Sequence, residues 1–145
     1  MSTPIYPRQA LTRMLDAIQA AELNGGAVKL FQNDFQPTDL SVIADFVEAD
    51  FGGYAAITHV EFTDPAAIND LNAAQVNSDN TLDFVCDGTA PTNIIYGYWY
   101  INSTNDLVVS ERFDVPQSMS LLGDSIMLVL RQTEPLGLGV AILEP

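Results

Sequence analysis

Two apolar, aromatic-rich runs on either side of a polar turn dominate the pattern of hydrophobic and polar positions. The first run, Ile94–Ile101, carries large side chains on both sides of an extended chain. One side holds Ile94, Tyr96, Tyr98 and Tyr100, and the other holds Ile95, Gly97, Trp99 and Ile101. The second run, Leu107–Phe113, alternates in the same way, and Asn102–Asp106 between them is rich in residues that favour turns. The pattern predicts a β-hairpin that forms the core of the fold.

Shorter segments of strand composition surround this hairpin. They are Ala27–Gln32, Ala55–Thr63, Thr81–Asp87, Ser118–Leu122 and Ser125–Gln132. Val115-Pro116-Gln117 is expected to interrupt the sheet, because proline cannot donate to a strand ladder. Asn69–Asn80 is polar and is expected to be a loop, whereas Pro65–Asp70 is expected to form one helical turn.

Helical spacing is clearest near the N-terminus. Apolar residues recur at Leu11, Met14, Leu15, Ile18 and Ala21. Pro7 suits a first helical turn and Asn24-Gly25-Gly26 suits a helix end, so a helix is expected over residues 7–24. A brief helical turn capped by Thr38 is expected over Asp39–Phe46. It would bring Leu40, Val42, Ile43 and Phe46 towards the core.

These elements predict a single, mainly β domain. We expect an antiparallel β-sandwich or open barrel, jelly-roll-like, with an N-terminal α-helix and extended terminal arms. Residues 1–6 would form the N-terminal arm, 7–24 the helix, 27–132 the β domain and 133–145 a C-terminal tail with few means to fold alone. The pattern argues against a parallel βαβ fold, because long helices between the strands are missing.

Charge narrows the classes of partner. With 19 acidic and 5 basic residues the formal net charge is −14, which repels phosphate backbones and argues against nucleic-acid binding and against anionic membranes. No apolar run approaches the ~18 residues of a membrane span, and the start lacks the apolar core of a signal peptide. We therefore expect a protein that stays, or is assembled, in a cytoplasm. Only 17% of the residues are charged, below the ~25% of ordinary domains, so other chains are expected to cover some apolar surface.

The residue types needed for nucleophilic or metal catalysis are scarce. His59 is the single histidine, Cys86 the single cysteine and Lys29 the single lysine. His59 lies in an apolar strand pattern, and Cys86 is expected to be a buried, inert thiol. One histidine and one cysteine cannot complete a zinc site, and no phosphate-binding glycine motif is present. We assign no catalytic residue, no cofactor-binding residue and no metal ligand, and expect no enzyme activity.

Two acidic segments carry the oxygen-bearing side chains that calcium binds. Asn77–Asp83 places oxygen-bearing side chains at alternate positions, but an EF-hand loop would need Gly and Glu where the chain has Leu82 and Gly88. The second group is Asp45, Glu48 and Asp50. In both cases a solvated acidic surface is the preferred interpretation.

Three further interpretations concern the hairpin and the acids. The aromatic series Tyr96, Tyr98, Trp99 and Tyr100 would suit a sugar-stacking platform, although strand cores and subunit contacts use the same residues more often. A small hydrolase would need a pair of acids, and none stands out among the 19. Glu111 and Arg112 fall on opposite faces of the second strand, so a buried ion pair is expected there.

Several short motifs resemble a set of small proteins from environmental tailed phages, which are labelled virion structural components. The motifs are Phe46-Val47-Glu48-Ala49-Asp50-Phe51-Gly52-Gly53-Tyr54 preceded by Leu30–Asn33 and Pro37-Thr38, Ile95–Tyr100 followed by Ser110–Asp114, and Gly123-Asp124. They span roughly Lys29–Leu130. The helix and the Leu136–Pro145 tail depart from the family's pattern, and no catalytic residue carries over.

The resemblance implies a capsid decoration or cement protein. Such a protein would sit on the outside of the virion, as a homotrimer around a local threefold axis, and would bridge subunits of the major capsid protein. Its extended termini would contact neighbouring chains, and its acidic exterior would keep the particle soluble. The alternative from another class is a carbohydrate- or receptor-binding module of a tail fibre, which requires Tyr98 or Trp99 to be exposed in a shallow groove.

Overall fold

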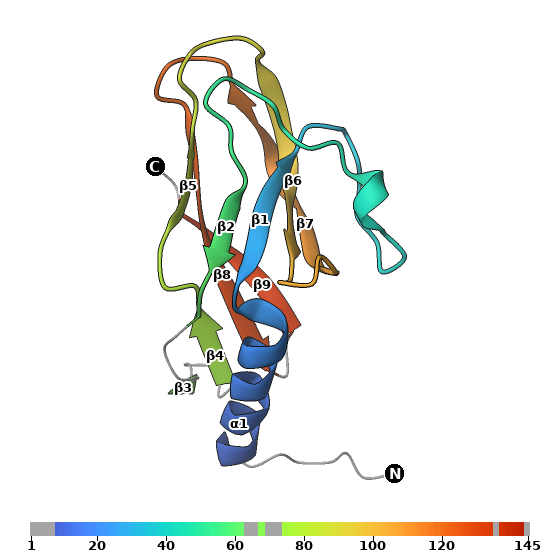
Figure 1. Cartoon of the computed structure of the whole chain (residues 1–145), viewed down its shortest axis with the longest axis vertical. Helices are drawn as coiled ribbons and strands as arrows, with labels where there is room; N and C mark the ends of the chain where they lie inside the picture. Colours follow the sequence, from blue (N-terminus) through green and yellow to red (C-terminus); the bar gives the residue numbers. More distant parts are fainter. Residues whose placement is uncertain (1–7, 63–66, 69–73, 135–136, 144–145) are drawn as a thin grey trace.

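The computed structural model describes residues 8–62, 67–68, 74–134 and 137–143. They form two antiparallel β-sheets that face each other, with helix α1 (Arg8–Ile18) packed at one end (Figure 1). The predicted antiparallel sandwich with an N-terminal helix is confirmed. The predicted arm over residues 1–6 lies outside the described residues.

The first sheet contains the predicted hairpin at its centre. Its strands run in the order β2 (Ile57–Val60), β1 (Gly26–Phe31), β6 (Asn93–Ile101) and β7 (Leu107–Met119). Strands β6 and β7 form the hairpin, and β1 pairs with the other side of β6. Consequently β7 lies at the outer edge of this sheet.

The second sheet is organised around β8 (Ser125–Glu134). On one side, β5 (Leu82–Val85) pairs with the first half of β8, and β4 (Ala74–Asn77) with the second half. The short strand β3 (Ala67–Ile68) pairs with β4. Strand β9 (Gly137–Leu143) pairs with the opposite side of β8.

Two predictions about irregular segments are wrong in part. Strand β4 lies inside the predicted loop Asn69–Asn80, and β9 lies inside the predicted tail 133–145. Both pair with β8, so hydrogen bonding to an existing strand, rather than a strong local pattern, gives them their extended conformation. Of the predicted helical turn Pro65–Asp70, the structure describes Ala67 and Ile68, and these form a strand.

Strand β7 continues through Pro116, where an interruption was predicted. The β6–β7 register shifts between the pairs Gly97↔Arg112 and Ile95↔Gln117, so Phe113–Pro116 forms a bulge opposite a single residue of β6. An edge strand tolerates proline at a bulge, because no partner needs its missing N–H there.

This bulge also changes which side chains of β6 share a face. Ile95 packs in the inner core with Tyr98 and Tyr100, whereas Tyr96 packs with Trp99 on the outer face. The prediction that Ile94 and Tyr96 share a face with Tyr98 is therefore wrong. Tyr96 lies opposite the bulge without a partner in the ladder, and the alternation of β6 does not continue unbroken across it.

The core between the sheets receives side chains from both of them. From the first sheet come Val28, Leu30, Val60, Ile95, Tyr98, Tyr100, Phe113 and Met119, and from the second Val76, Leu82, Phe84, Ile126, Leu128 and Leu130. Helix α1 packs against β4 and β8 and adds Leu15, and the π-helical turn Gln19–Leu23 that continues it adds Leu23. Met14, predicted to face the core, is exposed. No described helix is long and apolar enough to cross a membrane.

A long segment between β1 and β2 covers the outer face of the first sheet and projects from the side of the sandwich (Figure 1). It supplies Phe35 and Phe46 to an outer cluster that also contains Ala27, Phe31, Tyr96, Trp99, Ile101 and Leu107. The first sheet is thus covered on both faces, by the second sheet on one and by this segment on the other.

The predicted helical turn in this segment is a short 3-10 turn, Ile43–Asp45. Only Phe46 reaches the interior, so the prediction that Leu40, Val42 and Ile43 point to the core is wrong. Polar contacts fix the turn instead. The Asp45 carboxylate accepts from Val42 N at 2.8 Å. Asn33 donates to Asp45 O and accepts from Val47 N, both at 2.9 Å.

Candidate functional site

The aromatic residues of the hairpin are buried. Tyr98 and Tyr100 are 0% exposed and Trp99 is 2% exposed. Phe46 stacks on Trp99 with ring centroids 5.0 Å apart and planes at 15°. Because the chain covers these rings itself, the sugar-stacking platform that requires Tyr98 or Trp99 in an open groove is contradicted.

The tyrosine hydroxyls of the inner face act as structural hydrogen-bond donors. Tyr98 Oη donates to Glu111 Oε2 at 3.0 Å, and Tyr100 Oη donates to the Leu23 carbonyl, which ties the hairpin to the end of the helical segment. Burial raises the pKa of the Tyr98 hydroxyl far above its ordinary value, and the negative charge of Glu111 adds to the shift. Burial raises the pKa of Tyr100 to about 12. Both hydroxyls therefore stay protonated at neutral pH.

His59 lies exposed on β2, the edge strand opposite β7, with a φ of 55° that non-glycine residues seldom adopt. It borders a shallow cavity of about 250 Å³ that Glu61 and Asp79 also line. Among the described residues, the His59 imidazole has no hydrogen-bond partner. Cys86 is buried elsewhere, and its Sγ accepts from Gly88 N at 3.4 Å. The structure brings these two residues into no nucleophile–base pair.

The acids of the group Asp45, Glu48 and Asp50 make separate contacts. Glu48 pairs with Lys29 at 3.1 Å and accepts from the Tyr54 hydroxyl at 3.0 Å. Asp50 Oδ1 accepts from Asn93 Nδ2 at 2.9 Å, and Asp45 caps the 3-10 turn. These carboxylates fasten the projecting segment to β1 and β6.

The other acidic segment, Asn77–Asp83, also uses its polar groups locally. Ser78 Oγ donates to Asn80 O at 3.2 Å and accepts from Leu130 N at 3.1 Å, which ties the segment to β8. Among the described residues, no three or more histidine, cysteine or acidic side chains are grouped so that they could hold a metal ion.

Arg112 forms an ion pair, but its partner is Asp34 and the pair lies at the surface, whereas a buried pair at Glu111 and Arg112 was predicted. Arg112 Nη1 lies 2.5 Å from Asp34 Oδ1 and donates to Phe35 O at 3.1 Å. Its guanidinium also lies 5.0 Å from the centre of the Tyr96 ring. Asp34 is largely exposed, so this pair fastens the projecting segment to β7 at the surface rather than in the core.

Two turns are among the places where large apolar side chains reach solvent. In the projecting segment Leu40 is 85% exposed, and Val42, Ile43 and Val47 are also exposed; these four residues are called the apolar loop below. In the turn between β7 and β8, Leu121 and Leu122 are exposed, the latter by 81%.

Hydrogen bonds hold the backbone of this second turn. Asp124 Oδ2 accepts from Ser120 N at 2.9 Å and from Leu121 N at 2.7 Å, and these bonds lower the pKa of the carboxyl. Both apolar turns are therefore fixed by polar groups while their leucines point outward.

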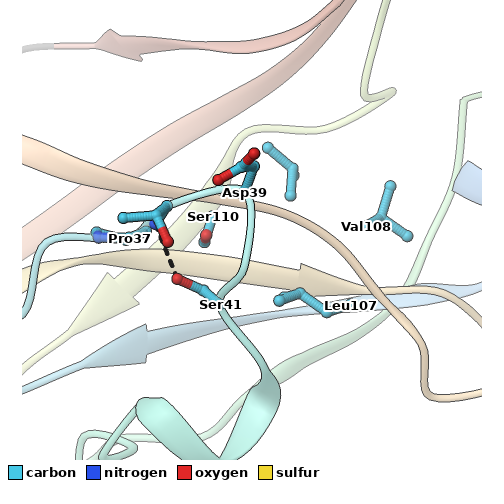
Figure 2. Close-up of a pocket in the computed structure, with 8 residues that line it drawn as sticks. Pro37, Asp39, Ser41, Leu107, Val108 and Ser110 are labelled. Atoms are coloured by element: carbon cyan, nitrogen blue, oxygen red, sulfur yellow. Dashed lines mark hydrogen bonds between the residues drawn. The ribbon is translucent and has the colours of Figure 1, made fainter.

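A groove separates the projecting segment from the outer edge of the first sheet. Pro37, Thr38, Asp39 and Ser41 form one wall, and Leu107, Val108, Val109 and Ser110 of β7 form the other (Figure 2). Its volume is about 430 Å³. Thr38 and Asp39 are exposed, and the other residues that line the groove are half-buried.

The sequence did not identify these surface features. The helical spacing of Leu40, Val42 and Ile43 predicts that they are buried, whereas the structure exposes them. Asn33 and Asp45 are the sequence feature that could have indicated this turn. Their hydrogen bonds fix the turn without burying Leu40, Val42 and Ile43. Comparison with protein-family models, with curated proteins and with solved structures finds no match to this chain.

Proposed function

We propose that this chain is a structural protein that binds to a larger assembly through exposed apolar side chains on rigid turns. The proposal is based on a contrast in side-chain exposure. The hairpin aromatics are buried, whereas Leu40 and Leu122 extend into solvent from turns that hydrogen bonds hold in place. Exposed apolar groups that are gathered at defined positions are typical of interaction surfaces.

The polar contacts support a mechanical role. Lys29, Glu48 and Tyr54 form a connected set that fixes the projecting segment on the first sheet, and Arg112 fastens the same segment to β7. These contacts hold the projecting segment against the first sheet, which preorganises the apolar loop. A preorganised surface loses less entropy on binding than a mobile one.

The specific version of this role is capsid decoration. It rests on the resemblance to virion structural proteins of tailed phages, together with the net charge of −14. In this version a homotrimer on the capsid exterior bridges subunits of the major capsid protein, and its acidic exterior repels free DNA. An interface of the order of 1,000 Å² or more for each contact would give useful reinforcement.

Removal and restoration of the protein test this role. Particles stripped of the chain are expected to lose resistance to heat and osmotic shock, and addition of the purified chain is expected to restore it. Stripped particles that resist heat and osmotic shock as well as intact ones would contradict the proposal.

A further inference from the structure

Strand β7 has an unpaired edge. Within the described residues it pairs with β6 and with no other strand. Alternate residues of an edge strand direct their N–H and C=O groups away from the sheet. Such an edge accepts a further strand unless something blocks it.

The two halves of β7 differ in this respect. The second half carries the bulge Phe113–Pro116, with a proline and the exposed Asp114, which are features that prevent strand addition. The first four residues, Leu107–Ser110, contain no proline and no charged residue, and the ladder to β6 shifts by one residue at Val108; the charged Glu111 and Arg112 follow. This short stretch lacks the proline and the acid of the second half, so its edge is available for strand pairing.

The groove described above runs along Leu107–Ser110. Its far wall, Pro37–Ser41, is held at one end by the contacts of Arg112 with Asp34 and Phe35. Ser41 Oγ also accepts from Thr38 N at 2.8 Å, which closes the turn in the wall (Figure 2). The groove thus lies between Leu107–Ser110 of β7 and a turn that a hydrogen bond closes.

The surroundings of the groove are acidic. Asp39 lines it, and the exposed Asp106 precedes Leu107 directly. The nearby cation, Arg112, is already paired with Asp34. With a net charge of −14 over the whole chain, the field at this edge favours a positively charged occupant.

We propose that this groove binds an extended polypeptide segment that carries lysine or arginine side chains and adds to β7 as a further strand. Its backbone would pair with Leu107–Ser110, and its basic side chains would face Asp39 and Asp106. A second copy of the chain is a poor occupant, because pairing β7 with itself would bring Asp106, Glu111 and Asp114 of both copies together. The inference deepens the proposed function. The segment would belong to a subunit of the shell, and that assignment rests on the proposed function.

The test uses the full chain and short synthetic peptides. A peptide of alternating valine and lysine is titrated into labelled protein, and binding is followed by amide chemical shifts and hydrogen exchange. We expect slowed exchange and shift changes at Leu107–Ser110 and at Pro37–Ser41. A peptide of alternating valine and glutamate is expected not to bind, and N-methylation of alternate amides of the lysine peptide is expected to abolish binding.

Matched variants locate the contact. Asp39→Asn is expected to weaken the lysine peptide about two- to fivefold, as for a partly exposed ion pair. Asp83→Asn, at an exposed position on β5 in the other sheet, is the control and is expected to have no effect. The proposal is overturned if no peptide binds, if the N-methylated peptide binds equally well, or if the shifts map to Leu121 and Leu122. Protection of Leu107–Ser110 that rises with protein concentration alone would identify a second copy and would also overturn it.

Failure of the groove proposal can be distinguished from failure of the proposed function. If particles contain the chain and Asp39→Asn binds them as tightly as the unaltered protein, the decoration role stands and the groove is not its contact. If the lysine peptide binds as described but particles lack the chain, the groove stands and the decoration role fails.

Discussion

The Tyr98 hydroxyl donates a 3.0 Å hydrogen bond to the Glu111 carboxylate directly across the β6–β7 pair. The ring is fully buried, and the bond joins the two strands of the central hairpin on the side of the core. Tyr98→Phe removes the hydroxyl and keeps the ring. We expect the free energy of unfolding, measured in urea, to fall by about 1 kcal/mol.

Tyr96→Phe is the matched control for this prediction. Tyr96 lies on the same strand, and its hydroxyl makes no hydrogen bond to any described residue. Its free energy of unfolding is expected to stay within about 0.5 kcal/mol of the unaltered protein. Equal stability of the two variants would show that the Tyr98–Glu111 bond contributes nothing.

Buried tyrosines also predict how stability depends on pH in the alkaline range. Burial raises the folded-state pKa of Tyr54 and Tyr98, and raises that of Tyr100 to about 12. The contribution of such a tyrosine to stability is complete at a pH below its pKa in the unfolded chain, which is about 10. This contribution is lost as the pH rises through its pKa in the folded chain. The free energy of unfolding should therefore fall as the pH rises above about 10.

Tyrosinate absorbance at 295 nm provides the measurement. We expect ionisation of these three tyrosines to coincide with unfolding, followed in parallel by circular dichroism. Complete tyrosine ionisation near pH 10 in a chain that keeps its native dichroism would contradict the burial of the hairpin.

Trp99 reports on the attachment of the projecting segment, because it is the single tryptophan of the chain and Phe46 stacks on it. Phe46→Ala should expose the indole, shift its emission to longer wavelength, raise quenching by acrylamide and lower stability by about 3 kcal/mol. Val47→Ala changes the adjacent exposed residue and should alter none of these. Unchanged emission of Phe46→Ala would show that Trp99 is covered in another way.

The apolar loop predicts a change in particle binding without a change in fold. The double variant Leu40→Ser, Val42→Ser should unfold at the same urea concentration, because both side chains are exposed. If the loop docks on a shell, the variant should bind stripped particles more than about tenfold more weakly, since two buried apolar side chains contribute more than 1.4 kcal/mol. Met14→Ser, at an exposed position on α1, is the control. Equal binding of all three proteins would exclude the loop from the interface.

The sequence predicted the parts of the fold with a strong local pattern. Helix α1, the hairpin and the strands β1, β2, β5 and β8 were all expected from periodicity and turn residues. Strands β4 and β9 were missed, because their conformation depends on β8 as a hydrogen-bonding partner and a single-sequence pattern does not contain that partner.

The surface features were harder to predict, for a related reason. Apolar periodicity in Asp39–Phe46 indicated burial, but Asn33 and Asp45 hold that turn by polar contacts and only Phe46 is used as an anchor. The bulge at Phe113–Pro116 interrupts the β6–β7 ladder where the side chains of β6 change faces, and β7 is an edge strand because, among the described strands, it pairs with β6 alone. Registers and exposed edges are properties of paired strands and are not visible in one strand's sequence.

If this chain is a structural component of a phage particle, as we propose, it should be present in purified particles in a defined amount relative to the major capsid protein. Quantitative mass spectrometry of gradient-purified virions gives this ratio. We expect a fixed ratio, set by the symmetry of the shell and reproduced between preparations. Absence of the chain from the particles, or a trace amount that varies between preparations, would contradict it.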